Sequence, residues 1–423
     1  MISFLTVMIE PIKRHRKIYH GWYVSFATCC SELGNHCASI TLFSLFVMPM
    51  VSDFGWSRTQ ISLPASLGCI SGAILSPIVG RLVDKYGARF ILPAGAVVLA
   101  VSCLYMSVIT SLIGFYVVFT LIRTIDQGVV NTATYPTIGK WFFKYKGKVT
   151  SLIMLTGAMA TVVSIPLISL VITNYGWRVA WAVLSLLPII FGILPALLFI
   201  RKSPEQMGLL IDGQNQIDDA HVYDVQQYNE WTLKDVLKTR FFWCVFTALF
   251  MIGAAGPGIT LHLSSHLLEQ GVSMATISTA LVIFALSGAL GIGIAGILAD
   301  KFDIKMLMIV ACIVATLSMG ILIQADTMLE TFMFVAIWGF SLITIHPLIP
   351  VLWSHIYGRE LLGTINGMSR VTLVLGLASG PVISGLMYDL TNSYNGAFIF
   401  FMLGSLASVL LLIASGNPND SKK

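Results

Sequence analysis

Charged side chains are scarce in this sequence. Asp, Glu, Lys and Arg together make up 11% of the 423 residues, whereas 56% are hydrophobic. A soluble protein of this length needs a far larger polar surface, and apolar runs of about 20 residues recur along the whole chain. The composition therefore predicts an all-α polytopic membrane protein that lies in a lipid bilayer and has no nucleic-acid partner.

The sequence also lacks the usual signatures of cofactor, metal and catalytic sites. Its seven cysteines form no C-x-x-C pair, and all of them fall inside apolar runs. No H-E-x-x-H or G-x-S-x-G motif is present. The run GIGIAG (291–296) matches a dinucleotide fingerprint but lacks the preceding strand, so we interpret it as small residues for close helix packing. We expect no cofactor, no metal and no enzymatic activity.

Apolar runs of at least about 18 residues predict twelve membrane-spanning helices. We expect them at 22–50, 59–79, 90–110, 112–138, 148–173, 178–200, 241–266, 274–298, 305–325, 329–352, 362–387 and 395–415. All but four of the 25 lysines and arginines fall on the side that carries both termini, the exceptions being Arg58, Arg123, Arg178 and Arg370. The positive-inside rule therefore predicts a cell-membrane protein with cytoplasmic termini. Since the basic cluster near the N-terminus follows the apolar stretch, we expect no cleaved secretory signal.

The sequence repeats itself with an offset of 216 residues. The aligned segments are DFGWSRTQIS (53–62) with EQGVSMATIS (269–278) and GRLVDKYGAR (80–89) with GILADKFDIK (296–305). The repeat predicts two pseudo-symmetric six-helix halves at 1–204 and 240–423, joined by a cytoplasmic loop at 205–239. Transporter repeats place a substrate site at their interface, near the middle of the bilayer.

These features resemble the major facilitator superfamily. Its loop signature is matched by Gly80, Asp84, Lys85, Gly87 and Arg89, and the second copy keeps Gly296, Asp300 and Lys301. RTIDQG is similar to the helix 4 motif of that family. GWYV, KWFFKYKGK, GWRVAW and RKSPEQMGL resemble its monocarboxylate porter and oxalate/formate exchanger group, and the latter also carries a basic residue on helix 11. The resemblance implies a secondary transporter that works by alternating access.

The loop motif also has a physical role of its own. Its glycines permit a tight turn, and its acidic residue suits a helix N-terminus. We expect the motif residues of both copies to act in gating, latching the halves in the outward-open state. The alternative is a loop whose charges only set the orientation in the membrane.

Arg370 points most directly to a substrate. It lies about 12 Å inside its helix, where a charge in lipid costs about 2.5–3.5 kcal/mol. Because a guanidinium pairs bidentately with a carboxylate, we expect Arg370 to bind a small organic anion of the monocarboxylate type. We assign Asn366, His36 and His262 to the same substrate site. The alternative is a structural arginine in a carrier of a neutral or cationic solute, such as a sugar or a drug.

Three acidic or basic residues indicate proton coupling. Arg123 and Asp126 lie one turn apart on helix 4 and can form an ion pair; the resemblance links this arginine to proton transfer, while a structural pair is the alternative. Glu32 and His36 share one face of helix 1, about 16 Å deep. A carboxylate without a partner there would be driven to its neutral form, so Glu32 is the main candidate proton carrier. A neutral acid that ties two helices together is the alternative.

The seventh and eleventh spans contain histidines and small residues. His262 and His266 are four residues apart, which could suit a metal, but the sequence offers no third ligand; gate residues or hydrogen-bonded histidines are the other interpretations. We interpret GAAGPG (253–258), GLASG (376–380) and Pro166 as sites of close helix packing, like GIGIAG. Breaks in those helices would supply bends and free carbonyls near the site.

The sequence thus predicts a secondary active transporter of a small organic anion that also carries protons. We expect it to function as a monomer. A membrane sensor or an intramembrane enzyme is the alternative from another class, and no appended signalling domain or catalytic motif supports either.

Overall fold

The computed structural model describes residues 19–142, 145–211, 231–299, 301–325, 327–357 and 362–416. The first six spans consist of α1 (His20–Asn35) with α2 (Ile40–Phe54), α3 (Arg58–Tyr86), α4 (Ala88–Ser107), α5 (Leu112–Ile125) with α6 (Asn131–Trp141), α7 (Lys146–Tyr175), and α8 (Trp177–Leu184) with α9 (Leu194–Phe199). The short α10 (Leu233–Lys238) precedes the last six spans, α11 (Arg240–Glu269), α12 (Met274–Ala299), α13 (Ile304–Gln324), α14 (Met328–Tyr357), α15 (Leu362–Thr391) and α16 (Asn395–Ala414). Twelve spans are long and apolar enough to cross a membrane, which confirms the predicted all-α, twelve-span fold for the described residues.

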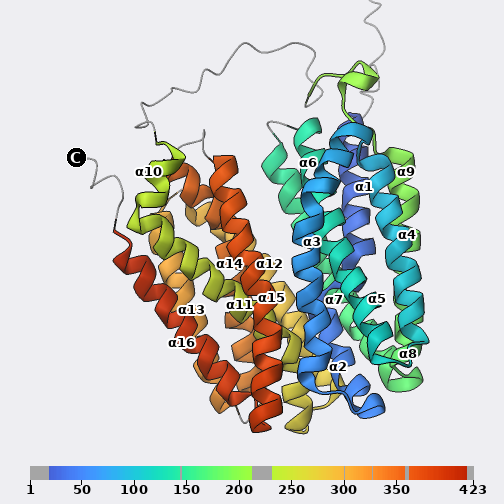
Figure 1. Cartoon of the computed structure of the whole chain (residues 1–423), viewed down its shortest axis with the longest axis vertical. Coiled ribbons are helices and arrows are strands. Elements are labelled where there is room, and N and C mark those ends of the chain that lie inside the picture. Colours follow the sequence, from blue (N-terminus) through green and yellow to red (C-terminus); the bar gives the residue numbers. More distant parts are fainter. Residues whose placement is uncertain are drawn as a thin grey trace, which may run out of the picture.

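The two sets of six spans stand side by side (Figure 1). We call residues 20–199 the N-terminal half and residues 240–414 the C-terminal half. The halves meet where α2 packs on α11, α3 on α15 and α7 on α12. The predicted bounds of the connecting loop remain a prediction, because residues 212–230 lie outside the described part of the chain.

Helix starts confirm the internal repeat. The helices α12, α13, α14 and α15 each begin 216 residues after α3, α4, α5 and α7, respectively. The last pair, α8 and α16, is two residues out of step, at Trp177 and Asn395. The repeated sequence motifs therefore correspond to repeated helices.

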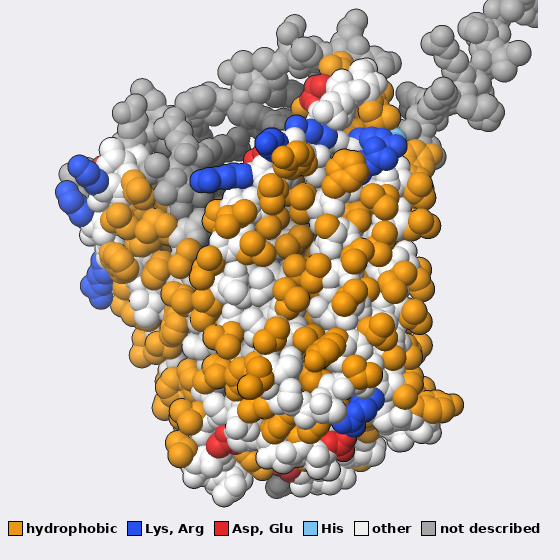
Figure 2. All heavy atoms as spheres, turned by 45° about the vertical axis from the view of Figure 1, so that its right-hand side comes forward, with side chains coloured by type: hydrophobic (Ala, Val, Ile, Leu, Met, Phe, Trp, Pro, Cys, Tyr) orange, Lys and Arg blue, Asp and Glu red, His pale blue; other side chains and the backbone are white. Residues whose placement is uncertain are grey.

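Charged side chains gather mainly at the two ends of the bundle, and apolar side chains cover its middle (Figure 2). The start of α1 and the end of α16 lie at the same end (Figure 1), which we call the basic end because Lys85, Arg89, Lys140 and Lys305 lie there. The other end is the opposite end. Exposed apolar side chains on the flanks suit contact with lipid.

The helices do not break at the positions that the sequence suggested. Pro166, Pro257 and Pro381 lie inside helices that continue past them. The irregular segments are instead η1 (His36–Ala38), a short 3-10 turn in the first span, and two π-helical segments, η2 (Asp126–Val130) and η3 (Pro188–Ile193). Such segments carry few local sequence signals, whereas the prolines are accommodated by close neighbours.

Glycines explain how α11 and α15 approach each other. A Cβ atom added to Gly380 would lie 2.0 Å from the Ala254 carbonyl oxygen, and one added to Gly376 would lie 2.4 Å from that of Phe250. The small-residue runs in these two helices therefore serve backbone-to-backbone packing.

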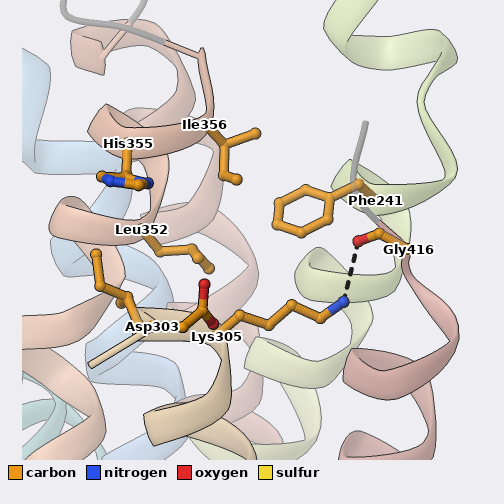
Figure 3. Close-up of a pocket in the computed structure, with 8 residues that line it drawn as sticks. Phe241, Asp303, Lys305, Leu352, His355, Ile356 and Gly416 are labelled. Atoms are coloured by element: carbon orange, nitrogen blue, oxygen red, sulfur yellow. Dashed lines mark hydrogen bonds between the residues drawn. The ribbon is translucent and has the colours of Figure 1, made fainter. Parts of the chain in front are cut away.

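A basic side chain at the start of the third helix of each half caps the end of its sixth span. Arg89 Nε donates to the Leu197 carbonyl oxygen at 3.1 Å, and Lys305 Nζ donates to the Gly416 carbonyl oxygen at 3.0 Å. Figure 3 shows Lys305 reaching below the Phe241 ring at the edge of a pocket of about 270 Å³. Cations stabilise helix C-termini, so these two equivalent basic residues stabilise the end of the sixth span in both halves.

We predict that Gly380→Ala destabilises the protein while Gly367→Ala does not. The first change forces α15 away from α11, and overpacking of this kind costs about 1–3 kcal/mol. The second places a Cβ atom in open space on the same helix. Thermal unfolding in detergent measures the difference; equal melting temperatures would show that the two helices are not in close contact.

Candidate functional site

A polar network surrounds Asp126 in the interior of the N-terminal half. Arg123 Nη1 lies 2.6 Å from Asp126 Oδ2, which confirms the predicted ion pair within the fourth span. Asn35 Nδ2 donates to Asp126 Oδ1 at 2.7 Å, and Gln127 Nε2 donates to Oδ2 at 2.8 Å. Arg123 Nη1 also donates to the Ala38 carbonyl oxygen at 2.7 Å, in the turn that interrupts the first span. The network therefore joins the irregular segments of spans one and four.

Glu32 lies beside this network but outside it. Its side chain is half-buried, and no hydrogen bond or ion pair joins it to a described residue. It interacts electrostatically with Asp126 and with Tyr135 of α6. Glu32 Oε1 would be 3.5 Å from a Cβ atom at Gly157 of α7, so its carboxyl group faces the fifth span.

Arg370 reaches toward the same region from the C-terminal half. It lies eight residues after the start of α15, is exposed, and forms no ion pair with a described acidic residue. It interacts electrostatically with Tyr135, which also interacts electrostatically with Glu32 and Asp126. A basic residue of one half and an acidic residue of the other are thus placed around one tyrosine. Tyr135 is not among the residues predicted from the sequence, although Asn131, Thr132 and Thr134 make this stretch of the chain polar.

The remaining predicted substrate residues lie elsewhere or outside the described side chains. His36 does not bond to Glu32; its ring lines an apolar groove between α7 and the sixth span. The side chain of Asn366 lies outside the described residues. His262 is fully buried, with Nε2 2.9 Å from Ser62 Oγ and Nδ1 3.2 Å from the Tyr394 hydroxyl, so both ring nitrogens have partners in this conformation.

His266 is held between aromatic rings rather than at a metal site. Its ring meets those of Tyr394 and Phe398 edge-on, with centroids 5.9 and 5.1 Å away. No group of three potential metal ligands occurs in the described part of the chain. His262 therefore agrees with the interpretation as a hydrogen-bonded histidine, whereas His266 packs against aromatic rings.

A clasp of charged residues closes the opposite end of the interface between the halves. Arg58 Nη2 lies 2.7 Å from Glu269 Oε1, and the Tyr388 hydroxyl donates to the same oxygen at 2.8 Å. The Arg58 guanidinium also lies over the Tyr388 ring, at 5.1 Å. Asp389 accepts the backbone N–H groups of Arg58 and Thr59, both at 3.0 Å, and so caps α3 from the other half.

Polar contacts between the halves continue inward from this clasp. Ser44 Oγ lies 2.8 Å from Ser264 Oγ, and His262 meets Ser62 across the same interface. From the sequence, Arg58 is predicted only as a loop charge, because its partners come from α11 and α15, more than 200 residues away. A repeat-breaking signal was present: Met274, its counterpart in the second half, carries no charge.

The predicted gating residues at the basic end bond within their own half in this conformation. Lys140 Nζ lies 2.9 Å from Asp84 Oδ1, and Lys202 Nζ donates to the Lys85 carbonyl oxygen at 2.9 Å. Gly87 has a φ of +82°, which permits the turn between α3 and α4. Their gating role stays a prediction, as it does for Gly80, Arg89 and Lys301.

In the second copy of the loop motif, Asp300 and the side-chain surroundings of Gly296 lie outside the described residues.

Comparison with known proteins places this geometry in a family. A family model described as Major Facilitator Superfamily matches residues 24–378. The chain is 23% identical to the uncharacterized MFS-type transporter YcxA of Bacillus subtilis, over 88% of this chain and 90% of that protein. It is 22% identical to monocarboxylate transporter 12-B of Danio rerio, over 93% of this chain and 86% of that protein. It is 25% identical to the oxalate:formate antiporter of Oxalobacter formigenes, over 55% of this chain and 54% of that protein.

A solved structure shows the same fold. The nucleoside transporter NupG superposes with a TM-score of 0.73 at 13% identity, covering 93% of this chain and all of that one. At this identity the likeness concerns the fold alone.

The Asp126 network predicts strong coupling between Arg123 and Asp126. Removing one partner of a buried ion pair costs about 3–5 kcal/mol, because the other charge is left uncompensated. Arg123→Gln and Asp126→Asn alone should therefore lower the melting temperature more than the double variant does. Additive losses, measured in detergent for the three variants, would contradict a structural ion pair.

The clasp predicts that Glu269→Gln separates the halves at the opposite end. Arg58 then loses its charged partner, and the contact between α3 and α11 weakens. Spin labels at exposed Tyr175 and Leu329, in a cysteine-free background, measure the separation of the two halves. Arg178→Gln is the matched control, because its 2.8 Å ion pair with Asp53 lies at the same end but within one half. Equal distance distributions in both variants would refute the clasp.

Proposed function

Because the chain belongs to the Major Facilitator Superfamily, a family of transporters rather than enzymes, we propose that this multi-pass secondary transporter moves a small organic anion together with a proton. The single observation that carries this proposal is Arg370, a cation within a span that interacts electrostatically with Tyr135 of the other half and has no acidic partner among the described residues.

Arg370 supports an anionic substrate on energetic grounds. An unpaired guanidinium in a span is costly, and a bound carboxylate would offset that cost with a bidentate, charge-assisted pair. Two relatives are named as a monocarboxylate transporter and an oxalate:formate antiporter, and these names specify small carboxylates. They support the same class of substrate for this chain. We assign to the Tyr135 hydroxyl a neutral hydrogen bond to the same substrate, because Tyr135 interacts electrostatically with Arg370.

Glu32 supports coupling to protons. Arg123 already balances the charge of Asp126, whereas Glu32 has no cation bonded to it. A carboxylate without a cation is costly inside a membrane, and a proton removes that cost. An anion that binds to Arg370 neutralises its positive charge, so the negative charge of Glu32 is no longer balanced by it. A proton that binds to Glu32 removes that charge. We therefore assign the proton to Glu32 and a structural role to Arg123 and Asp126.

The clasp supports a direction for the conformational cycle. We assign the basic end to the cytoplasm, following the lysine and arginine distribution. The described structure then has its outer end held shut by Arg58, Glu269 and Asp389, while α6 and α10 stand apart at the inner end (Figure 1). Opening the clasp while the inner ends close would expose Arg370 to the outside. The cycle needs only one chain, so we propose a functional monomer in the cell membrane.

Uptake into proteoliposomes tests the substrate class. Labelled lactate, pyruvate, formate and oxalate are supplied with and without an inward proton gradient. We expect at least one acid to be taken up, Arg370→Gln to reduce its uptake at least tenfold, and Arg178→Gln to leave it unchanged. Uptake of a neutral or cationic solute that no organic acid inhibits, with Arg370→Gln active, would instead favour the carrier of a neutral or cationic solute.

Glu32→Gln should separate transport from proton coupling. The neutral side chain mimics the protonated acid, so exchange of labelled for unlabelled acid should persist. Accumulation driven by the proton gradient should be lost. Asp126→Asn should impair folding first, since it breaks the network around Arg123. If Glu32→Gln still accumulates substrate against its gradient, Glu32 does not carry the proton.

A further inference from the structure

His262 lies at the interface between the halves, about 10 Å inward of Glu269 along α11. Its ring is fully buried in this conformation. Nε2 lies 2.9 Å from Ser62 Oγ of α3 and 3.1 Å from the Pro381 carbonyl oxygen of α15, and Nδ1 lies 3.2 Å from the Tyr394 hydroxyl. Pro381 and Tyr394 belong to the same half as His262, so Ser62 is its hydrogen-bond partner from the other half.

The hydrogen bonds determine which form of the ring fits here. The Ser62 hydroxyl donates its one hydrogen to the Arg58 carbonyl oxygen at 2.7 Å, so it can only accept from His262. The Pro381 carbonyl oxygen can only accept as well, so Nε2 carries a hydrogen. In the neutral ring Nδ1 then accepts, and the Tyr394 hydroxyl donates to it. The neutral ring therefore pairs both of its nitrogens without any acid.

A proton on Nδ1 would disturb this arrangement. Nδ1 would become a donor, and the Tyr394 hydroxyl would have to turn its hydrogen away. Two charged groups interact with the ring, Arg58 and Asp389, and they have opposite signs. Asp389 accepts the backbone N–H groups of Arg58 and Thr59 and forms no hydrogen bond with His262. Because a buried cation without a bonded acid is costly, the closed interface favours the neutral ring.

The other titratable side chains on the helices around His262 have contacts of their own. Glu269 of α11 bonds to Arg58 and to the Tyr388 hydroxyl of α15, and His266 packs between two aromatic rings. The helix α2 also packs on α11, but Asp53, its one charged residue, bonds within the N-terminal half. None of these groups provides the missing acid for a charged His262.

We propose that His262 is a second proton-binding site, which water reaches only when the halves separate at the opposite end, and that a proton bound there keeps this end open. Separation moves Ser62 away from the ring. A histidine in water binds a proton below about pH 6.5. Above this pH the ring is neutral in both forms, and the closed form keeps its hydrogen bonds. As the pH falls, the proton binds to the open form and shifts the equilibrium toward it.

The site would set an order for the steps of the cycle. With the basic end assigned to the cytoplasm, external acid favours the form that is open to the outside, and the proton has to leave His262 before the clasp closes. This site is distinct from Glu32, which lies in the N-terminal half beside the Asp126 network. It is also independent of Arg370 and of the transported solute.

Distance measurements at two pH values test the site without any substrate. Spin labels at exposed Tyr175 and Leu329, in the cysteine-free full-length protein in nanodiscs, give the ratio of molecules that are open and closed at the opposite end. We expect this ratio to rise about tenfold from about pH 7.5 to about pH 5.5. His262→Gln stays neutral and keeps a donor group, so its ratio should change less than about twofold. His262→Lys is charged at both pH values and should be open at both.

Two further variants separate His262 from its neighbours. His266→Gln, one turn along the same helix, should keep the tenfold response. Glu269→Gln should be more open at both pH values, because it breaks the clasp, and should still respond to pH. The proposal is overturned if the ratio of the unsubstituted protein does not change with pH, if His262→Gln responds as that protein does, if His262→Lys is closed, or if His266→Gln abolishes the response.

Discussion

The cost of a charge inside a bilayer governs the polar residues of this protein. Where a charged side chain is buried in the described structure, a partner compensates it: Arg123 pairs with Asp126, and Arg58 pairs with Glu269. These two pairs hold different parts of the machine together, one inside the N-terminal half and one between the halves. Glu32 and Arg370 differ because neither is bonded to a described residue. Because no described residue compensates these two charges, a substrate can compensate that of Arg370 and a proton that of Glu32.

The two compensated pairs also differ in how their geometry serves motion. Asp126 accepts from Arg123, Asn35 and Gln127, so both of its carboxylate oxygens are paired, which favours a fixed arrangement around the break in the first span. The bonds of Arg58 to Glu269 and of Asp389 to the start of α3 join one half to the other, and the Glu269 side chain is 30% exposed, so water can replace the lost contact when the end opens. A paired carboxylate in the interior and an exchangeable end fit a rigid half that rotates against its partner.

Sequence patterns predicted the fold well because the membrane imposes long apolar runs and the repeat is still visible. The twelve spans, the 216-residue offset and the Arg123–Asp126 pair all follow from spacing along one helix or one half. What the sequence could not supply was contact between distant helices: the partners of Arg58 and the position of Tyr135 opposite Arg370 depend on how the halves pack. The prolines misled for a similar reason, since α11 and α15 remain continuous where neighbouring glycines let backbones approach closely. His36 lines the groove beside α7 and forms no bond with Glu32, although the two residues are one helical turn apart in the sequence.

The central claim is that position 370 is left without an acidic partner so that a transported acid can provide one. Equilibrium binding of a labelled organic acid to purified protein, compared between the native chain and Arg370→Gln with Arg370→Lys alongside, tests this most directly. We expect saturable binding that weakens at least tenfold in the glutamine variant and partly recovers with lysine. Equal affinity in all three proteins would contradict it.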